Sequence, residues 1–151
     1  MYHNRSMNNR INRIHERALR IVYRDNELSF EELLDKDNSV TIHHRNLQRL
    51  AIEIFKVKNN VSPPFMSKIF VENDKPYDLR SNQMMKTSLA KSVYNGTETV
   101  SFRGPEVWAL IPENIRSSTS LPEFKSKIKS WRPEGCTCRL CKTYISGIGF
   151  L

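Results

Sequence analysis

The sequence predicts a mainly α-helical protein: a small helical bundle with an irregular middle segment, one short β-strand or hairpin, and a cysteine-rich C-terminal tail. Residues 8–24, 41–59 and 104–132 carry apolar side chains at spacings of three and four, which is the helical period. Ser29 with Glu32, and Ser120 with Glu123, match the capping box that starts a helix. Residues 72–95 show no sustained period, which is typical of an irregular connection.

The composition is that of an ordinary folded protein of 151 residues, with 38% hydrophobic and 26% charged residues. No apolar run approaches the roughly 18 residues that a membrane-spanning helix needs. The first 24 residues are too polar for a signal peptide. We therefore expect an intracellular protein, in the nucleus or the cytoplasm, with no membrane partner.

The net charge of +8 is concentrated at the two ends of the chain. Residues 1–24 contain six arginines and one glutamate, residues 125–151 contain six basic residues and one glutamate, and the remaining segment is slightly acidic. Concentrated positive charge attracts polyanions, of which RNA and DNA are the commonest inside cells. The alternative is a pair of solvated faces that only aid solubility.

The first helix is expected to bury one apolar side and to carry a row of arginines beside it. The apolar residues are Ile11, Ile14, Ala18, Ile21 and Val22. At about 100° per residue, five arginines fall in a strip roughly 80° wide: Arg10, Arg13, Arg17, Arg20 and Arg24. Fixed guanidinium groups in a row suit a phosphate backbone. An ordinary amphipathic helix, whose arginines pair with acids or extend to solvent, fits equally well.

Shorter signals place the remaining elements. A short helix starts at Ser29, and a longer core helix spans about Thr41–Asn59. Ser62 is expected to cap a helical turn that two prolines enter. Alternation over residues 97–102 predicts a strand that ends at the Gly104–Pro105 turn, after which helical spacing resumes. These signals divide the chain into a helical region (1–71), an irregular linker with a short strand (72–103), a helical pair (104–132) and the tail (133–151).

The last helix is expected to present Lys125 and Lys129 to a nucleic acid before the chain enters the tail. There Cys136, Cys138 and Cys141 follow one another as C-x-C-x-x-C, with Arg139 and Lys142 among them. Three thiolates can converge on zinc, but a tetrahedral site needs a fourth ligand. The candidates for it are a partner chain and four histidines: His3, His15, His43 and His44. A tail without metal and a redox role for the thiols remain open.

The motifs resemble, in their order, the C-terminal region of the polyproteins of non-LTR (LINE-type, jockey-like) retrotransposons. The matching stretches cover nearly the whole chain: NRIHERALRIVYRD, SFEELL, IHHRNLQRLAIEIFKVKNNVSPPFM, YDLR, YNGTETVSFRGPEVWALIPENIR, FKSKIKSW and CTCRLCKTYI. In this family the segment follows the palm of the reverse transcriptase, an RNA-directed DNA polymerase. The resemblance implies that the first helices form the thumb and that the cysteines form a zinc-knuckle-like, nucleic-acid-binding tail.

The chain departs from that family in ways that bear on catalysis. It carries no endonuclease portion and no palm, and no two aspartates are adjacent for two-metal phosphoryl transfer. We therefore expect a non-catalytic fragment that binds RNA or DNA and has no magnesium site. The alternatives are a helical protein-interaction module, whose apolar faces belong against the missing palm or another element-encoded protein, and a translated remnant of a truncated element without a function.

Overall fold

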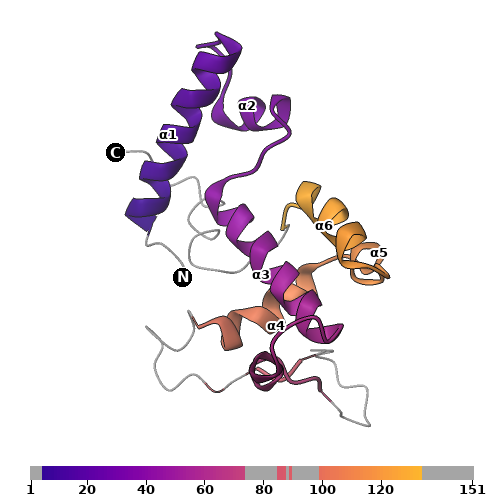
Figure 1. The fold of residues 1–151 in the computed structure, drawn as a ribbon. Helices are drawn as coiled ribbons and strands as arrows, with labels where there is room; N and C mark the ends of the chain where they lie inside the picture. The colour runs from indigo at the N-terminus through magenta and orange to yellow at the C-terminus, as the bar shows by residue number, and fades with distance from the viewer. Residues whose placement is uncertain (1–4, 74–84, 88, 90–98, 134–151) are drawn as a thin grey trace. The chain divides into compact units, whose positions relative to one another are not determined.

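The computed structural model describes residues 5–73, 85–87, 89 and 99–133 (Figure 1). Within these ranges the protein is mainly α-helical, as the sequence predicts. The helices are α1 (Arg5–Tyr23), α2 (Phe30–Lys36), α3 (Ile42–Lys58), the 3-10 helix η1 (Pro64–Lys68), α4 (Val100–Leu110), α5 (Glu113–Arg116) and α6 (Leu121–Ser130). The chain divides into two compact units between Asn46 and Leu47, inside α3. The cysteine-rich tail lies outside the described residues.

The first unit is built on contacts between α1 and α2. Leu19, Leu33 and Leu34 are buried in its core, and three partly buried residues pack against them: Tyr23, Leu28 and Phe30. The Tyr23 hydroxyl donates a 3.0 Å hydrogen bond to Oδ1 of Asp37, just beyond α2. This bond raises the pKa of Tyr23, because deprotonation would place a second negative charge beside the carboxylate.

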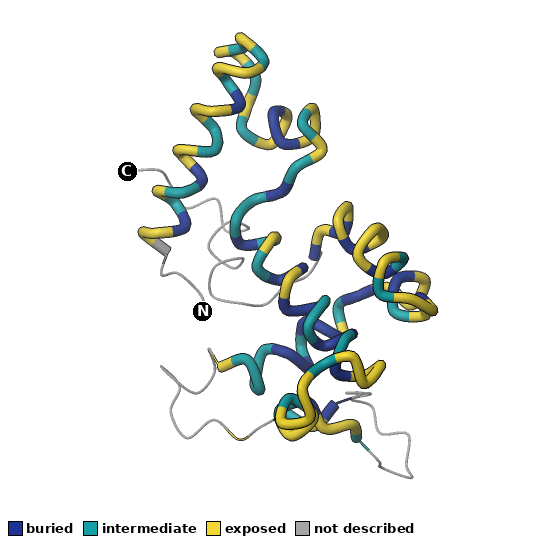
Figure 2. The backbone as a smooth tube through the Cα atoms, in the orientation of Figure 1, coloured by how far each residue is buried: buried dark blue, intermediate teal, exposed yellow. Residues whose placement is uncertain are grey.

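The buried side of α1 is not the one that its apolar residues predict. Asn8, Asn12 and Leu19 are buried, whereas Ile14 and Ile21 are 68% and 76% exposed. Val22 is also exposed, and Figure 2 shows an exposed outer side along much of α1. The expected burial of the apolar row is therefore wrong. One polar residue on this side has a partner in another element, because Oδ1 of Asn12 accepts a 3.2 Å hydrogen bond from the first amide of α3, that of Ile42. Oδ1 of Asn8 is buried without a hydrogen-bond partner among the described residues.

Helices α1, α2 and α3 end in the same way, with a non-glycine residue in the left-handed conformation. Arg24, Asn38 and Asn60 have φ values of 50°, 52° and 55°. In each case the next amide donates to a carbonyl five residues earlier, which is the long bond of a Schellman motif. Asparagine tolerates this conformation well, whereas arginine carries a steric cost. Arg24 therefore ends α1 at a position where glycine is usual.

The capping box predicted at the start of α2 is confirmed. The amide of Glu32 donates to Oγ of Ser29 at 3.3 Å, and the Glu32 carboxylate accepts from the Ser29 amide at 2.7 Å. Two amides that the helix leaves unpaired are thereby satisfied. The carboxylate also accepts from the Ser29 hydroxyl, and this bond is the main reason that the pKa of Glu32 is lowered.

The second unit has an aromatic core. The rings of Phe55 and Phe124 stack with centroids 4.2 Å apart, and Trp108 lies on Phe124 at 6.1 Å. Stacked rings at this separation add to the stabilisation that burial itself provides. Aliphatic residues from several helices complete the core, among them Leu50, Ile54, Val107, Ile111, Ile115 and Ile128. This core holds α4, α6 and the part of α3 from Leu47 onward in one unit.

The strand predicted over residues 97–102 is wrong for the part that the structure describes. Val100 and Phe102 belong to α4, which continues through Gly104 and Pro105 to Leu110. Gly104 permits a close approach, since a Cβ atom at this position would overlap the ring of Phe70. Alternating residues favour a strand locally, but burial of Val107 and Trp108 in the aromatic core favours the helix.

The connection between η1 and α4 contains an isolated antiparallel bridge, in which Glu72 pairs with Met85. Met85 is buried, and the carboxylate of Glu72 forms an ion pair with Lys58 at the end of α3. The prediction that Ser62 caps η1 is wrong, because the N-cap is Pro63 and no side chain caps the turn. The bridge lies in the segment that the sequence predicts to be irregular, and it involves no residue of the expected strand.

The start and end of α6 are both secured by side chains. Oγ of Ser120 accepts from the Glu123 amide at 3.4 Å, whereas the Glu123 carboxylate bonds Thr119 instead of returning to Ser120. The predicted second capping box is thus half formed. At the other end, the buried amide of Gln48 donates to the carbonyls of Lys129 and Trp131, at 3.1 Å and 2.9 Å. These bonds satisfy carbonyls that the helix leaves without a partner.

Candidate nucleic-acid interface

Three of the predicted arginines lie exposed on one side of α1. Arg10, Arg13 and Arg17 are spaced by three and four residues, so that their side chains follow one another along about 10 Å of helix. No carboxylate among the described residues lies within ion-pair distance of any of them. All three side chains are exposed, which makes them accessible to an external anion. We call these three residues the arginine row.

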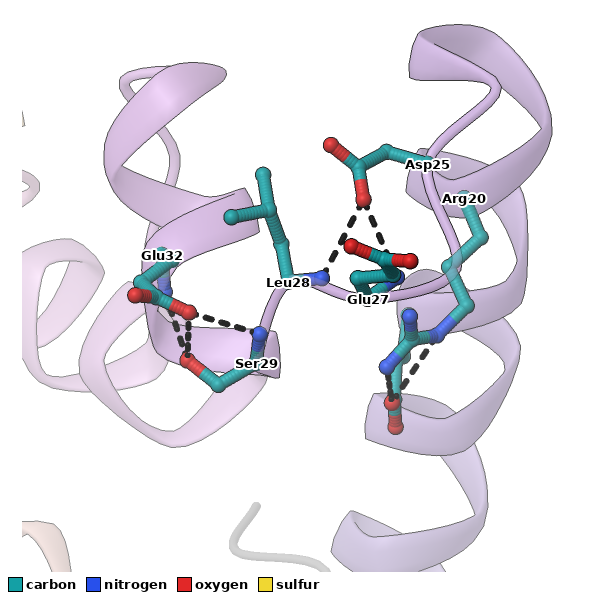
Figure 3. Close-up of polar contacts among 7 residues, drawn as sticks. Arg20, Asp25, Glu27, Leu28, Ser29 and Glu32 are labelled. Carbon is teal, nitrogen blue, oxygen red and sulfur yellow. Dashed lines mark hydrogen bonds and ion pairs between the residues drawn. The ribbon is translucent and has the colours of Figure 1, made fainter.

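Arg20 differs from the arginine row because it already has an acidic partner. Its Nη2 lies 2.8 Å from Oε1 of Glu16, one turn earlier on α1, and its Nε donates to the same oxygen at 3.3 Å (Figure 3). Both side chains are partly buried. A guanidinium held by a carboxylate in this way contributes less to binding a phosphate, because the pair must separate first.

Arg24 follows α1, at the left-handed position that ends the helix, and its side chain is exposed. The next residue, Asp25, organises the turn into α2. Its Oδ1 accepts hydrogen bonds from the amides of Leu28 at 3.1 Å and Glu27 at 3.0 Å (Figure 3). These bonds lower the pKa of Asp25 because they favour its charged form, and the bond from Leu28 has the larger effect. Oδ2 of Asp25 also lies 3.8 Å from Nζ of Lys36, so the carboxylate has a cationic partner within the first unit.

The predicted lysines on α6 are also exposed. Lys125 and Lys129 face solvent, and among the described residues no acid pairs with either. Lys127, which lies between them, is held at 2.7 Å by Glu123. Together with Thr119, this contact lowers the pKa of Glu123 to about 2. Lys125 and Lys129 belong to the second unit, whereas the arginine row belongs to the first.

The described histidines, His15, His43 and His44, are all at least partly buried, and their rings pack against other rings. The ring of His15 packs edge-on against Phe30 with centroids 5.9 Å apart. Burial, and to a smaller extent the charge of Arg45, lowers the pKa of His15 and so favours the neutral imidazole. His43 is buried and His44 partly buried, with ring centroids 6.0 Å apart. Within the described ranges, no group of three or more His, Cys, Asp or Glu residues could hold a metal ion.

The remaining predicted site residues cannot be placed. Cys136, Cys138, Arg139, Cys141 and Lys142 lie outside the described residues, as does His3. One residue that the sequence reasoning did not select is Arg45, which is exposed at the start of α3 in the first unit. Its charge acts on His15, so it adds to the positive potential of the unit that carries the arginine row. The sequence analysis assigned this segment to a core helix and did not examine its exposed side, on which Arg45 lies.

No protein-family model, no curated protein and no solved structure matches the chain. Within the described ranges, no helix combines the length and the apolar character needed to cross a bilayer. The side chains themselves therefore provide the support for a function.

Proposed function

We propose that this chain binds the phosphate backbone of RNA or DNA through the arginine row of α1, and that it catalyses no reaction itself. The observation that carries the proposal is that Arg10, Arg13 and Arg17 are exposed together on one helix without an acidic partner among the described residues. Arginine forks suit phosphate oxygens, and a row on one helix favours backbone contacts over base contacts.

The proposal includes an origin and a possible metal. The motif order supports descent from the C-terminal region of a LINE-type reverse transcriptase, in which α1 would belong to the thumb. The basic tail with Cys136, Cys138 and Cys141 would then supply further phosphate contacts through Arg139 and Lys142. Elemental analysis of the purified full chain decides whether these thiolates hold zinc, because a complete site binds one ion per chain.

The salt dependence of binding tests the proposal. The affinity of the full chain for single-stranded RNA, measured by fluorescence anisotropy, should fall steeply as the salt concentration rises. Changing Arg10, Arg13 and Arg17 to Ala together should reduce the slope of log K against log salt by about 2, since each phosphate contact on a single strand contributes roughly 0.7.

A matched control removes the same number of charges elsewhere. Arg49, Lys68 and Lys86 are exposed outside α1, and their triple alanine variant has the same net charge as the α1 variant. This control should keep nearly the whole slope. Equal losses in the two variants would contradict the proposed interface and would mean that binding depends on net charge alone.

A second candidate function is a helical module that binds other proteins. The exposed apolar row of α1, with Ile14 and Ile21 turned to solvent, favours it, because large apolar side chains in a contiguous exposed patch usually mark an interaction surface. Light scattering of the isolated chain tests this function. Self-association that Ile14→Ser and Ile21→Ser together abolish would support it, whereas a monodisperse chain that binds no helical partner would contradict it.

A further inference from the structure

The exposed apolar residues of α1 follow the pattern of a coiled-coil seam. Ile11, Ile14, Ala18 and Ile21 are separated by three, four and three residues, which is the spacing of alternating a and d positions in a heptad repeat. They extend over about 15 Å of helix. Ile14, Ala18 and Ile21 are exposed, and Ile11 is partly buried. We call these four residues the aliphatic seam.

The two sides of the aliphatic seam differ in chemistry. Arg10 and Arg17 lie seven residues apart along one side, at the g positions of the same repeat, and both are exposed. Asn8, His15 and Val22 occupy the e positions on the other side, and of these Val22 is exposed. Asn8 is buried, and His15 packs against Phe30 of the same unit. A helix lying on the seam would therefore meet arginines along one edge and the body of the first unit along the other.

A second copy of the chain does not suit this surface. In an antiparallel pair the g positions face each other, which would bring Arg10 and Arg17 of one copy opposite those of the other. In a parallel pair the g positions face the e positions, but Asn8 is already buried and His15 partly buried within their own unit. Neither arrangement supplies carboxylates to the arginines. Charge complementarity thus points to a different, acidic partner.

A single-stranded nucleic acid is also a poor match for the seam itself. Proteins that bind unpaired bases generally offer aromatic faces on which the bases stack. The aliphatic seam contains isoleucine and alanine and no aromatic ring. The arginine row suits phosphates, but the seam beside it suits another helix with aliphatic side chains.

We propose that the aliphatic seam binds an amphipathic helix of a partner protein, and that this helix carries Asp or Glu at the positions that face Arg10 and Arg17. The proposal rests on the second candidate function and specifies the chemistry of its partner. Apolar contact along the seam supplies the affinity, and the two arginines select an acidic flank and fix the register. An occupied seam also places carboxylates on two members of the arginine row, so the partner and RNA compete.

A charge-exchange experiment tests the proposal on the full chain. The probes are two designed peptides of about three heptads with Leu at a and d, one with Glu and one with Lys at every e and g position; like charges keep each from pairing with itself. The wild-type chain should bind the Glu peptide more tightly. The variant Arg10→Glu with Arg17→Glu should reverse the preference. Its affinity for the Glu peptide should fall roughly tenfold at low salt, because two ion pairs become repulsions, and its affinity for the Lys peptide should rise roughly tenfold for the opposite reason.

Variants that keep the charges control for the apolar part. Ile14→Ser with Ile21→Ser should abolish binding of both peptides while leaving the fold intact, because both side chains are exposed. Failure of the charge variant to alter the preference overturns the proposed partner. If neither peptide binds and the serine variant instead loses self-association, the interaction module stands but its partner is another copy. If neither binds and the serine variant instead loses RNA affinity, the seam contacts bases and the proposal fails.

Discussion

At the scale of single residues, the contact between Gly104 and Phe70 shows how closely the second unit is packed. The absence of a Cβ atom on Gly104 leaves room for the ring of Phe70, which is itself buried. The glycine lies inside α4 with an ordinary helical conformation, so its role is to provide space and not an unusual backbone angle. Glycine normally costs a helix about 1 kcal/mol relative to alanine, and the close contact explains why it is used here.

We predict that Gly104→Ala destabilises the second unit by about 1–3 kcal/mol, because the added methyl group forces the Phe70 ring to move in a packed core. Urea unfolding followed by tryptophan fluorescence measures this, since Trp108 and Trp131 both belong to that unit. Phe70→Leu should recover part of the loss in the Gly104→Ala background. A stabilised single variant would instead mean that helix propensity outweighs the contact.

At the scale of elements, α1 shows that the most apolar side of a helix need not be its buried side. The sequence correctly predicts that the segment is helical, because its apolar period is strong. The same period predicts the wrong buried side, because the pattern reflects only the hydrophobicity of the residues. It contains no information on a hydrogen bond to another element. The bond between Asn12 and the Ile42 amide is such an interaction, and it places a polar residue in the interior.

This assignment of the two sides of α1 leads to a prediction. Leu19→Ala should cost about 2–5 kcal/mol, because Leu19 is buried with Leu33 and Leu34. Ile14→Ser should change stability by less than about 0.5 kcal/mol, because its side chain is exposed. Amide hydrogen exchange in α1 and α2 measures both changes. The opposite ranking would restore the side that the sequence predicts.

Local signals proved most informative where a few adjacent residues determine the geometry. The capping box of Ser29 and Glu32 is correct because its bonds lie within four residues. The strand at residues 97–102 is wrong in its described part because Val107, Trp108 and the room beside Phe70 decide the conformation, and these contacts involve distant segments. The positions of the arginines on α1 follow from the helical period. That Arg20 forms an ion pair with Glu16 could be seen only in the structure.

The start of α6 should respond to acid. Contacts with Lys127 and Thr119 lower the pKa of Glu123 from 4.5 to about 2. A carboxylate with a lowered pKa in the folded state contributes stability above about pH 4.5 and loses this contribution as the pH falls through about 2. We therefore predict that Glu123→Gln is less stable than the wild type at pH 7 and that the difference disappears over this range.

Urea unfolding at several pH values, followed by tryptophan fluorescence, tests this prediction. Glu113→Gln is the control, because Glu113 forms an ion pair with Arg116 but accepts no bond comparable to that from the Thr119 amide. A difference between Glu123→Gln and the wild type that persists at pH 2 would show that the hydrogen bonds to Thr119 do not require the charge.

At the scale of the whole molecule, the distribution of charge matters more than the net value of +8. The described residues that we selected as phosphate contacts belong to both units, with the arginine row on α1 and with Lys125 and Lys129 on α6. Attraction to phosphates is independent of base sequence, so the proposed binding should extend to any accessible nucleic acid.

We predict accordingly that poly-uridylate and poly-adenylate of equal length bind the full chain with affinities within a few-fold of each other, and that heparin displaces both. Competition measured by fluorescence anisotropy at one fixed salt concentration gives the comparison. A preference of a hundredfold for either polymer would indicate base recognition, which the arginine row alone does not explain.

The arginine row and the aliphatic seam lie on the same helix, α1, and this has a consequence for regulation. If the proposed acidic helix binds the aliphatic seam, its carboxylates neutralise Arg10 and Arg17 and leave Arg13 as the remaining member of the arginine row. The affinity of the chain for a nucleic acid should then fall. This competition needs no conformational change, because the acidic helix and the nucleic acid would contact the same side chains, Arg10 and Arg17. The two ligands would then compete for α1, and their relative concentrations and affinities would determine which one is bound.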